Sequence, residues 1–273
     1  MRILCTGDLH LGRKRRRLNP DMLITGDTKI LDNIVHTAKE EQVDCLFILG
    51  DLFDSDDISS NIKEICLDKF SQLKETHIYI FPGNHDLGIN LNSPQITFFN
   101  ESMARKISDD ITVYAYDHKK GLDLADWNED KKSGFNIICG HLAVRELQLD
   151  KQRNAGISVS THDIAHWKAD LVLLGHDHNT RFLKQGNKIL ATYVGAPYNI
   201  YENELVARGV VICEIDKGQV NLRFRRLECP PEFKVKAAHM RTAEEINTRY
   251  GPVTVGEYTW KLIGSHVVNN FSM

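Results

Sequence analysis

Five segments of the chain place a possible metal ligand directly after a glycine that ends an apolar run. The five pairs are Gly7-Asp8, Gly50-Asp51, Gly83-Asn84, Gly140-His141 and Gly175-His176. Mixed oxygen and imidazole ligands suit Mn²⁺, Fe or Zn²⁺, and two such ions can polarise a phosphoryl group and generate hydroxide at neutral pH. Active sites of α/β proteins lie at the carboxyl ends of buried strands, which are themselves short apolar runs. We therefore expect all five groups on one rim of one sheet.

Taken singly, these residues have simpler interpretations. Asp8 fits a helix cap, Asn84 a turn residue and Asp54 an N-cap. Their joint occurrence favours a metal site, because core packing alone does not explain a possible ligand after each of the five glycines. Asp177 is the weakest member, fitting either a supporting contact to the metal ligands or a surface residue.

The first half of the chain alternates between strand and helix patterns. Apolar runs at 2–6, 44–49 and 78–81 predict strands, and helical spacing at 30–38 and 60–75 predicts two intervening helices. A βαβαβ start favours parallel strands with right-handed crossovers.

After residue 110 the pattern becomes rich in strands. Strands are predicted at 111–116, 135–139, 171–174, 188–194, 208–215 and 219–227. Asp216-Lys217-Gly218 is typical of a hairpin turn between the last two. Segment 117–133 is charged and predicts a surface excursion, and Pro230-Pro231 marks a boundary. Beyond it we expect a capping box at Thr242 and Glu245 and a strand near 258–263. A two-layer β core flanked by helices fits better than one doubly wound sheet.

Composition narrows the functional class. The 273 residues are 42% hydrophobic and 26% charged, with a net charge of −3, which fits a globular protein that does not coat nucleic acid through overall charge. The six cysteines form no C-x-x-C pair and indicate a reducing compartment. We find no P-loop and no apolar run long enough to span a bilayer, and we expect a cytoplasmic protein without membrane association.

The ordered motifs resemble those of the calcineurin-like metallophosphoesterase superfamily. They are Asp8-Leu9-His10, Gly50-Asp51-Leu52-Phe53-Asp54, Gly83-Asn84-His85-Asp86, Gly140-His141 and Gly175-His176-Asp177-His178, and the match extends from residue 1 to about 215. The resemblance implies a four-layer α/β/β/α sandwich. We expect a phosphoesterase domain at 1–229 and a short C-terminal appendage at 230–273, either a reduced cap or a partner-binding segment.

The same resemblance implies roles for individual residues. Two divalent ions, with Mn²⁺ expected and Fe or Zn²⁺ as alternatives, would be bridged by Asp51. One ion would be held by Asp8, His10 and His178, and the other by Asn84, His141 and His176. His85 would be the proton donor or phosphate-positioning group, oriented by Asp54 or Asp86.

A basic run and the residues that occupy the motifs predict the class of substrate. Arg13, Lys14, Arg15, Arg16 and Arg17 follow the first motif directly, and we expect them to hold a DNA backbone, although a solvated loop is the simpler alternative. Within the superfamily the motifs are most similar to the SbcD-type DNA repair nucleases. That similarity implies a Mn²⁺-dependent exonuclease and endonuclease, usually a dimer, with an SbcC-like SMC ATPase partner.

Three alternatives to a nuclease with an ATPase partner stay open. Residues 231–273 are too few for both the cap and the ATPase-binding segment of those nucleases, so a stand-alone nuclease is the alternative to the ATPase complex. A small-molecule phosphodiesterase or phosphatase is the alternative reaction class, since the same core serves many substrates. A scaffold without catalysis is a third interpretation, which the complete ligand set disfavours.

Overall fold

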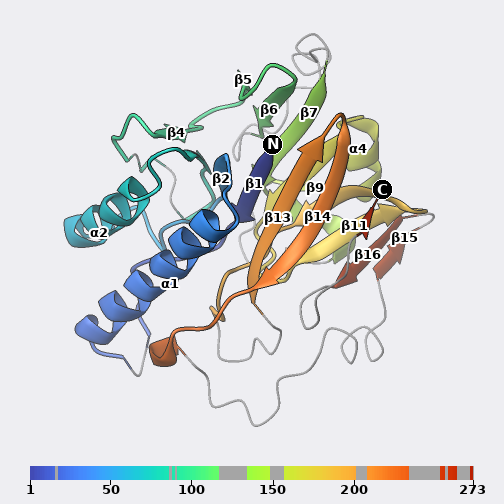
Figure 1. The fold of residues 1–273 in the computed structure, drawn as a ribbon. Coiled ribbons are helices and arrows are strands. Elements are labelled where there is room, and N and C mark those ends of the chain that lie inside the picture. Colours follow the sequence, from blue (N-terminus) through green and yellow to red (C-terminus); the bar gives the residue numbers. More distant parts are fainter. Residues whose placement is uncertain are drawn as a thin grey trace.

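Two β-sheets lie face to face between layers of helix in the computed structural model of the chain (Figure 1). The structure describes residues 1–15, 18–85, 88–89, 91–116, 134–147, 157–200 and 208–233, and the strand backbones at 253–255, 258–262 and 271–272. Within these residues, no helix is both long enough and apolar enough to cross a membrane.

The first sheet has seven strands in the order β17-β14-β13-β1-β2-β3-β4. Strands β1 to β4 are parallel, and β13, β14 and β17 continue the sheet in antiparallel pairs. The bounds are β1 Arg2–Thr6, β2 Cys45–Leu49, β3 His77–Phe81, β4 Ile96–Phe98, β13 Gly209–Asp216, β14 Gln219–Arg226 and β17 Phe271–Ser272. The turn between β13 and β14 has positive φ at Lys217 (48°) and Gly218 (79°), as a tight hairpin requires.

The second sheet has eight strands in the order β15-β16-β11-β12-β10-β7-β6-β5. Its central strands β6, β7, β10 and β12 are parallel. The bounds are β5 Met103–Lys106, β6 Ile111–Ala115, β7 Phe135–His141, β10 Leu171–Gly175, β11 Arg181–Gln185, β12 Lys188–Tyr193, β15 Val253–Val255 and β16 Tyr258–Leu262. A small parallel pair is formed by β8 Ala143–Val144 and β9 Ser158–Val159.

The α-helices of the described residues, three in number, begin at polar caps. In α1 (Pro20–Glu40) the Asn19 side chain accepts from the Met22 amide, and Pro20 occupies the first turn, where its missing N–H costs nothing. Ser59 caps α2 (Ser60–Ser71), and Ser160 forms a capping box with Asp163 at α4 (Thr161–His166). Two 3₁₀ turns, η1 (Arg145–Leu147) and η3 (Pro231–Phe233), complete the described helical segments.

Alternation along the strands divides the core into three layers. Leu46 of β2 packs with the residues of α1 and α2, which lie side by side on the outer face of the first sheet (Figure 1). The next residue, Phe47, faces the second sheet and packs in the same cluster as Ile137 of β7. Ile138 points the opposite way, toward Ile164 of α4. Successive side chains of a strand point to opposite faces. A fully buried strand therefore packs against the helices on one face of its sheet and against the other sheet on the opposite face.

The predicted four-layer α/β/β/α arrangement is confirmed. The expected strands and the strand near 258–263 are present, while 117–133 and the expected capping box at 242–245 lie outside the described residues. Strands β4, β5 and β11 were not predicted, because β5 is mostly exposed and none of the three has a clear apolar alternation. The division at residue 230 stays a prediction, although β15, β16 and β17 extend the two sheets rather than forming a sheet of their own.

Candidate metal centre

The loops after β1 and β2 lie against each other through their backbones. The Asp8 amide donates to the Gly50 carbonyl (2.9 Å), the His10 amide to Asp51 (2.9 Å) and the Leu11 amide to Leu52 (3.0 Å). This pairing continues the parallel β1–β2 ladder beyond the strand ends. It brings the D-x-H and G-D-x-x-D motifs together, with Asp8 and Asp51 buried.

The second sheet supplies His141, His176 and His178, which corrects the expectation of a single sheet. His141 ends β7, and its Nδ1 lies 2.9 Å from the Leu49 carbonyl at the end of β2. His176 follows β10, and its amide donates to the two Asp8 carboxylate oxygens at 3.2 and 3.3 Å. The five glycine junctions therefore come from two sheets, because strand ends of facing sheets meet at one edge of the sandwich.

Ligand-type atoms from these loops converge on a small volume. Asp8, His10 and His178 each offer one ligand atom, and these atoms lie within 4.8 Å of one another. The same holds for Asp8, Asp51 and His141. His176 also lies at this centre, its ring 5.2 Å from that of His141. The structure thus brings together the residues predicted for the first ion and most of those predicted for the second. Their roles as ligands stay predictions.

Around His141, the side-chain atoms of Asn84 and Asp51 that face its ring are hydrogen-bond acceptors. If His141 Nδ1 donates to the Leu49 carbonyl, the other ring nitrogen, Nε2, carries a lone pair. That nitrogen lies 3.1 Å from the side-chain oxygen of Asn84 and 3.3 Å from Asp51 Oδ2. Such a set needs a positive charge among its members, either a proton or a metal ion, and His10 Nε2 is also buried without a hydrogen-bond partner among the described residues. The residues present therefore fit divalent metal ions.

Glycine is required where these groups approach the backbone. A Cβ on Gly50 would lie 2.1 Å from His141 Nδ1, and this glycine also has a φ of +84°. A Cβ on Gly83 would lie 2.0 Å from Asp51 Oδ1. Gly50 and Gly83 thus make room for a candidate ligand from a neighbouring segment, which explains part of the sequence pattern.

Four residues of the centre have left-handed backbones. The φ values are 51° at Asp8, 46° at His10, 49° at Asp51 and 95° at His176. This region costs non-glycine residues of the order of 1–3 kcal/mol each, and such strain gathers at functional sites. The packing of the two sheets stabilises a geometry that the local sequence disfavours.

Burial and mutual charge set the protonation of the centre. Burial raises the pKa of Asp8 to about 7, opposed by His141. For Asp51, burial acts in the same direction, but His141 outweighs it and the pKa lies well below its usual range. For His141, burial lowers the pKa, but Asp51 and Asp8 outweigh it and raise the pKa to about 10. Without metal, a proton on His141 balances the carboxylates; divalent ions held at this centre would supply that positive charge instead.

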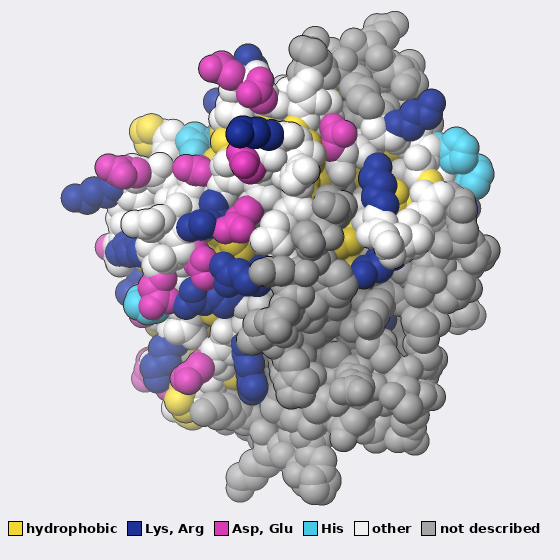
Figure 2. Space-filling model, turned by 45° about the vertical axis from the view of Figure 1, so that its right-hand side comes forward, with side chains coloured by type: hydrophobic (Ala, Val, Ile, Leu, Met, Phe, Trp, Pro, Cys, Tyr) yellow, Lys and Arg dark blue, Asp and Glu magenta, His cyan; other side chains and the backbone are white. Residues whose placement is uncertain are grey.

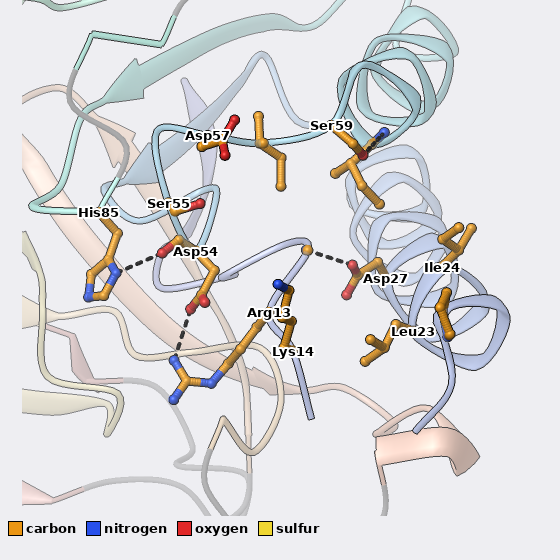
Figure 3. Close-up of a pocket in the computed structure, with 14 residues that line it drawn as sticks. Arg13, Lys14, Leu23, Ile24, Asp27, Asp54, Ser55, Asp57, Ser59 and His85 are labelled. Atoms are coloured by element: carbon orange, nitrogen blue, oxygen red, sulfur yellow. Dashed lines mark hydrogen bonds and ion pairs between the residues drawn. The ribbon is translucent and has the colours of Figure 1, made fainter. Parts of the chain in front are cut away.

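Asp54 connects His10, His85 and Arg13. Its Oδ1 accepts from Arg13 at 2.9 Å and lies 3.1 Å from His10 Nδ1, while its backbone carbonyl lies 2.8 Å from His85 Nδ1 (Figure 3). The carboxylate therefore orients His10, and the carbonyl orients His85. The alternative partner, Asp86, lies outside the described residues.

The basic run divides into residues with different contacts. Arg13 pairs with Asp54, and Lys14 is exposed. Arg15 stacks over Phe233, 4.2 Å from the ring centroid, and donates to the Asn199 carbonyl at 3.2 Å. Arg16 and Arg17 lie outside the described residues. Expectations of DNA contact for this run stay predictions.

Two supporting residues were missed or undervalued by sequence reasoning. Asp177 is buried, with Arg181 Nε 2.5 Å from its Oδ2, and it holds the loop between two histidines. Arg208 is buried and donates to the His178 carbonyl and to the side-chain oxygen of Asn199. No motif marks Arg208, because its partners are distant in sequence.

Comparison with known proteins agrees with this geometry. The family model for calcineurin-like phosphoesterases matches residues 1–180. The chain belongs to this family. Its members bind two divalent metals, and the candidate ligands at this centre fit that property.

Individual relatives of this phosphoesterase are distant. The SbcD component of the SbcCD nuclease from Staphylococcus saprophyticus is 24% identical over 263 residues, covering 82% of this chain and 68% of the relative. A dimetal phosphatase from Danio rerio superposes with a TM-score of 0.50 at 13% identity, covering 82% of this chain and 96% of that one. GAP50, an anchor in the inner membrane complex of Plasmodium, gives 0.51 at 12% identity over 88% of each chain. At these identities the two structures show a shared fold alone.

Proposed function

We propose that this phosphoesterase hydrolyses phosphodiester bonds in DNA with two divalent ions, Mn²⁺ being the expected metal. One observation carries the proposal. Arg13 and Lys14 line a cavity that His85 and Asp54 also line, so positive side chains lie beside the residues that we propose act on the reacting phosphate (Figure 3). A phosphodiester anion is attracted by such charges, and the flanking backbone extends past them.

The residues of the centre have complementary roles in this proposal. Asp8, His10, Asp51, Asn84, His141, His176 and His178 hold the ions. When bound, two divalent ions polarise the phosphoryl oxygens and lower the pKa of water. The attacking oxygen forms a bond to phosphorus as the ester oxygen leaves. With Nδ1–H of His85 donating to the Asp54 carbonyl, Nε2 is the nitrogen left for a phosphate or leaving oxygen, and it donates a proton there when the ring is in its doubly protonated form.

Charge on the surface favours local rather than broad attraction of DNA. On the face drawn in Figure 2, the described Lys and Arg side chains are interspersed with Asp and Glu. The net charge of −3 agrees with this distribution. Binding should therefore depend on the few cations beside the centre, and affinity should fall moderately with salt.

The relative in Staphylococcus supports the same substrate. That protein is named as part of the SbcCD nuclease, and by this resemblance we propose DNA processing for the present chain. An SbcC-like ATPase partner and a homodimer are further proposals from the same source. Residues 230–273 are the proposed appendage in which a partner would bind.

Cleavage of end-labelled DNA tests the proposal. Single- and double-stranded oligonucleotides labelled at the 5′ or 3′ end are incubated with Mn²⁺, and products are sized on denaturing gels. We expect metal-dependent cleavage that an Asp51→Asn variant loses. Intact DNA alongside rapid hydrolysis of a cyclic nucleotide would overturn the DNA assignment.

A small-molecule phosphodiesterase is the second candidate, favoured by the size of the same cavity. Its volume of about 650 Å³ lies in the range of small-ligand sites. The comparison of DNA with cyclic nucleotide at equal enzyme and Mn²⁺ concentrations decides between the two.

A further inference from the structure

The cavity beside the metal centre lies between three segments. The loop after β1 (12–14), the start of α1 (20–27) and the stretch from the β2 loop into α2 (54–62) provide its walls. In Figure 3 His85 lies on one side of the cavity, and Leu23 and Ile24 lie on the opposite side. A group attached to a phosphate at the metal centre can therefore extend from His85 toward α1.

The walls combine aliphatic surface with polar groups. Leu23, Ile24, Ile58 and Ile62 supply the aliphatic part. Three carboxylates (Asp27, Asp54, Asp57) face two cations (Arg13, Lys14), and Arg13 is already paired with Asp54. Toward α1, where Asp27 adds a buried carboxylate, this balance does not favour a second phosphate. It suits a flat, uncharged ring with apolar faces and a polar edge.

Asp27 is a buried carboxylate that the metal centre does not use. It is 3% exposed, lies in α1, and its Oδ2 accepts from the Gly12 amide at 2.7 Å. A carboxylate has about four lone-pair sites, so further acceptor capacity is available to a ligand in the cavity that Asp27 lines. Carboxylates in proteins accept hydrogen bonds from the exocyclic amino group of cytosine.

We propose that this cavity binds the nucleoside next to the scissile phosphate, with the base between the aliphatic side chains of α1 and α2 and its amino edge at Asp27. The inference rests on the proposed function, because it concerns the substrate of the same metal centre. That substrate class is nucleotide diesters whose base is unstacked. In duplex DNA such a base leaves its stack, so frayed ends and single strands are the preferred substrates.

Matched chromogenic esters test the cavity. Deoxycytidine 5′- and 3′-(4-nitrophenyl phosphate) are compared with methyl 4-nitrophenyl phosphate in Mn²⁺, all three releasing 4-nitrophenolate. We expect at least one nucleoside ester to have a kcat/KM about tenfold or more above that of the methyl ester, from burial of the base. Leu23→Trp, which fills the cavity, should abolish this preference and keep the methyl ester rate.

Met22→Trp is the matched control, because Met22 adjoins Leu23 but is 39% exposed and does not line the cavity. It should keep the preference. Equal kcat/KM for nucleoside and methyl esters by an enzyme that cleaves DNA would overturn the cavity assignment alone. Equal losses on all esters in Leu23→Trp would also overturn it. Absence of hydrolysis of every diester and of DNA would overturn the proposed function, and this inference with it.

Asp27→Asn tests the polar edge. Asparagine can still accept from the Gly12 amide but presents an amino donor to the cavity. The wild type should prefer the deoxycytidine ester over the thymidine ester severalfold, and the variant should reverse that order, because thymine offers a carbonyl oxygen there. An unchanged order in the variant would overturn the contact with Asp27.

Discussion

Gly83→Ala tests whether the glycine spacing exists to make room for the predicted metal ligands. The added Cβ would lie 2.0 Å from Asp51 Oδ1 and 2.5 Å from the Asp51 backbone nitrogen. Real Cβ contacts are essentially never below 3.0 Å, so the Asp51 carboxylate must move by roughly 1 Å. Rotation of the side chain does not relieve the contact with the backbone atom. The Asp51 Oδ1 bond to the His85 amide, now 3.0 Å, would be displaced as well.

The expected effect is large for a single methyl group. A misplacement of about 1 Å at a catalytic centre costs on the order of 100-fold in rate. We therefore expect kcat/KM for a chromogenic diester to fall about 100-fold, and bound Mn²⁺ measured by atomic emission to fall below that of the wild type.

The control is Gly186→Ala, at a position with a φ of +57° and no atom within 4 Å of an added Cβ. That variant should lose about 1–2 kcal/mol of stability to backbone strain and keep its activity. Thermal unfolding of both variants separates loss of fold from loss of the centre. Full metal content and full activity in Gly83→Ala would refute the reasoning.

Four further substitutions test individual residues. His85→Ala should keep its bound metal, measured by atomic emission, and lose about 10²–10⁴-fold in turnover of a diester; full activity would contradict the role of His85. Arg15→Ala should lower the free energy of unfolding by about 1 kcal/mol, because the stacking of Arg15 on Phe233 is lost. Lys14→Ala should instead weaken DNA binding, measured by fluorescence anisotropy, and should reduce the slope of log K against log salt concentration by about one. Burial raises the pKa of Asp27 in the folded protein to about 7. The protonated side chain therefore stabilises the fold at low pH, and this contribution is lost as the pH rises through 7. The free energy of urea unfolding of the wild type, relative to that of Asp27→Asn, should fall by about 2.5 kcal/mol between pH 5 and 8, and a constant difference would contradict this.

Much of the fold could be predicted from local patterns. The apolar runs of β1, β2 and β3 and the helical spacing between them depend on burial at each position, which the sequence displays directly. The start of α1 was missed although Asn19-Pro20 is a typical N-terminal signal. Strand β11 lies between β12 and β16, and its place depends on partners distant in the chain.

The sequence by itself determined the family, because ligand-type side chains follow glycines at strand ends in the order typical of calcineurin-like phosphoesterases. Only the tertiary structure decided that two sheets share those ligands, that Asp54 contacts His10 through its carboxylate and His85 through its backbone, and that Arg15 packs on Phe233. The reason is physical. Residue type and periodicity are local properties, whereas the groups that meet at the centre are joined by contacts between residues as far apart as Asp8 and His176.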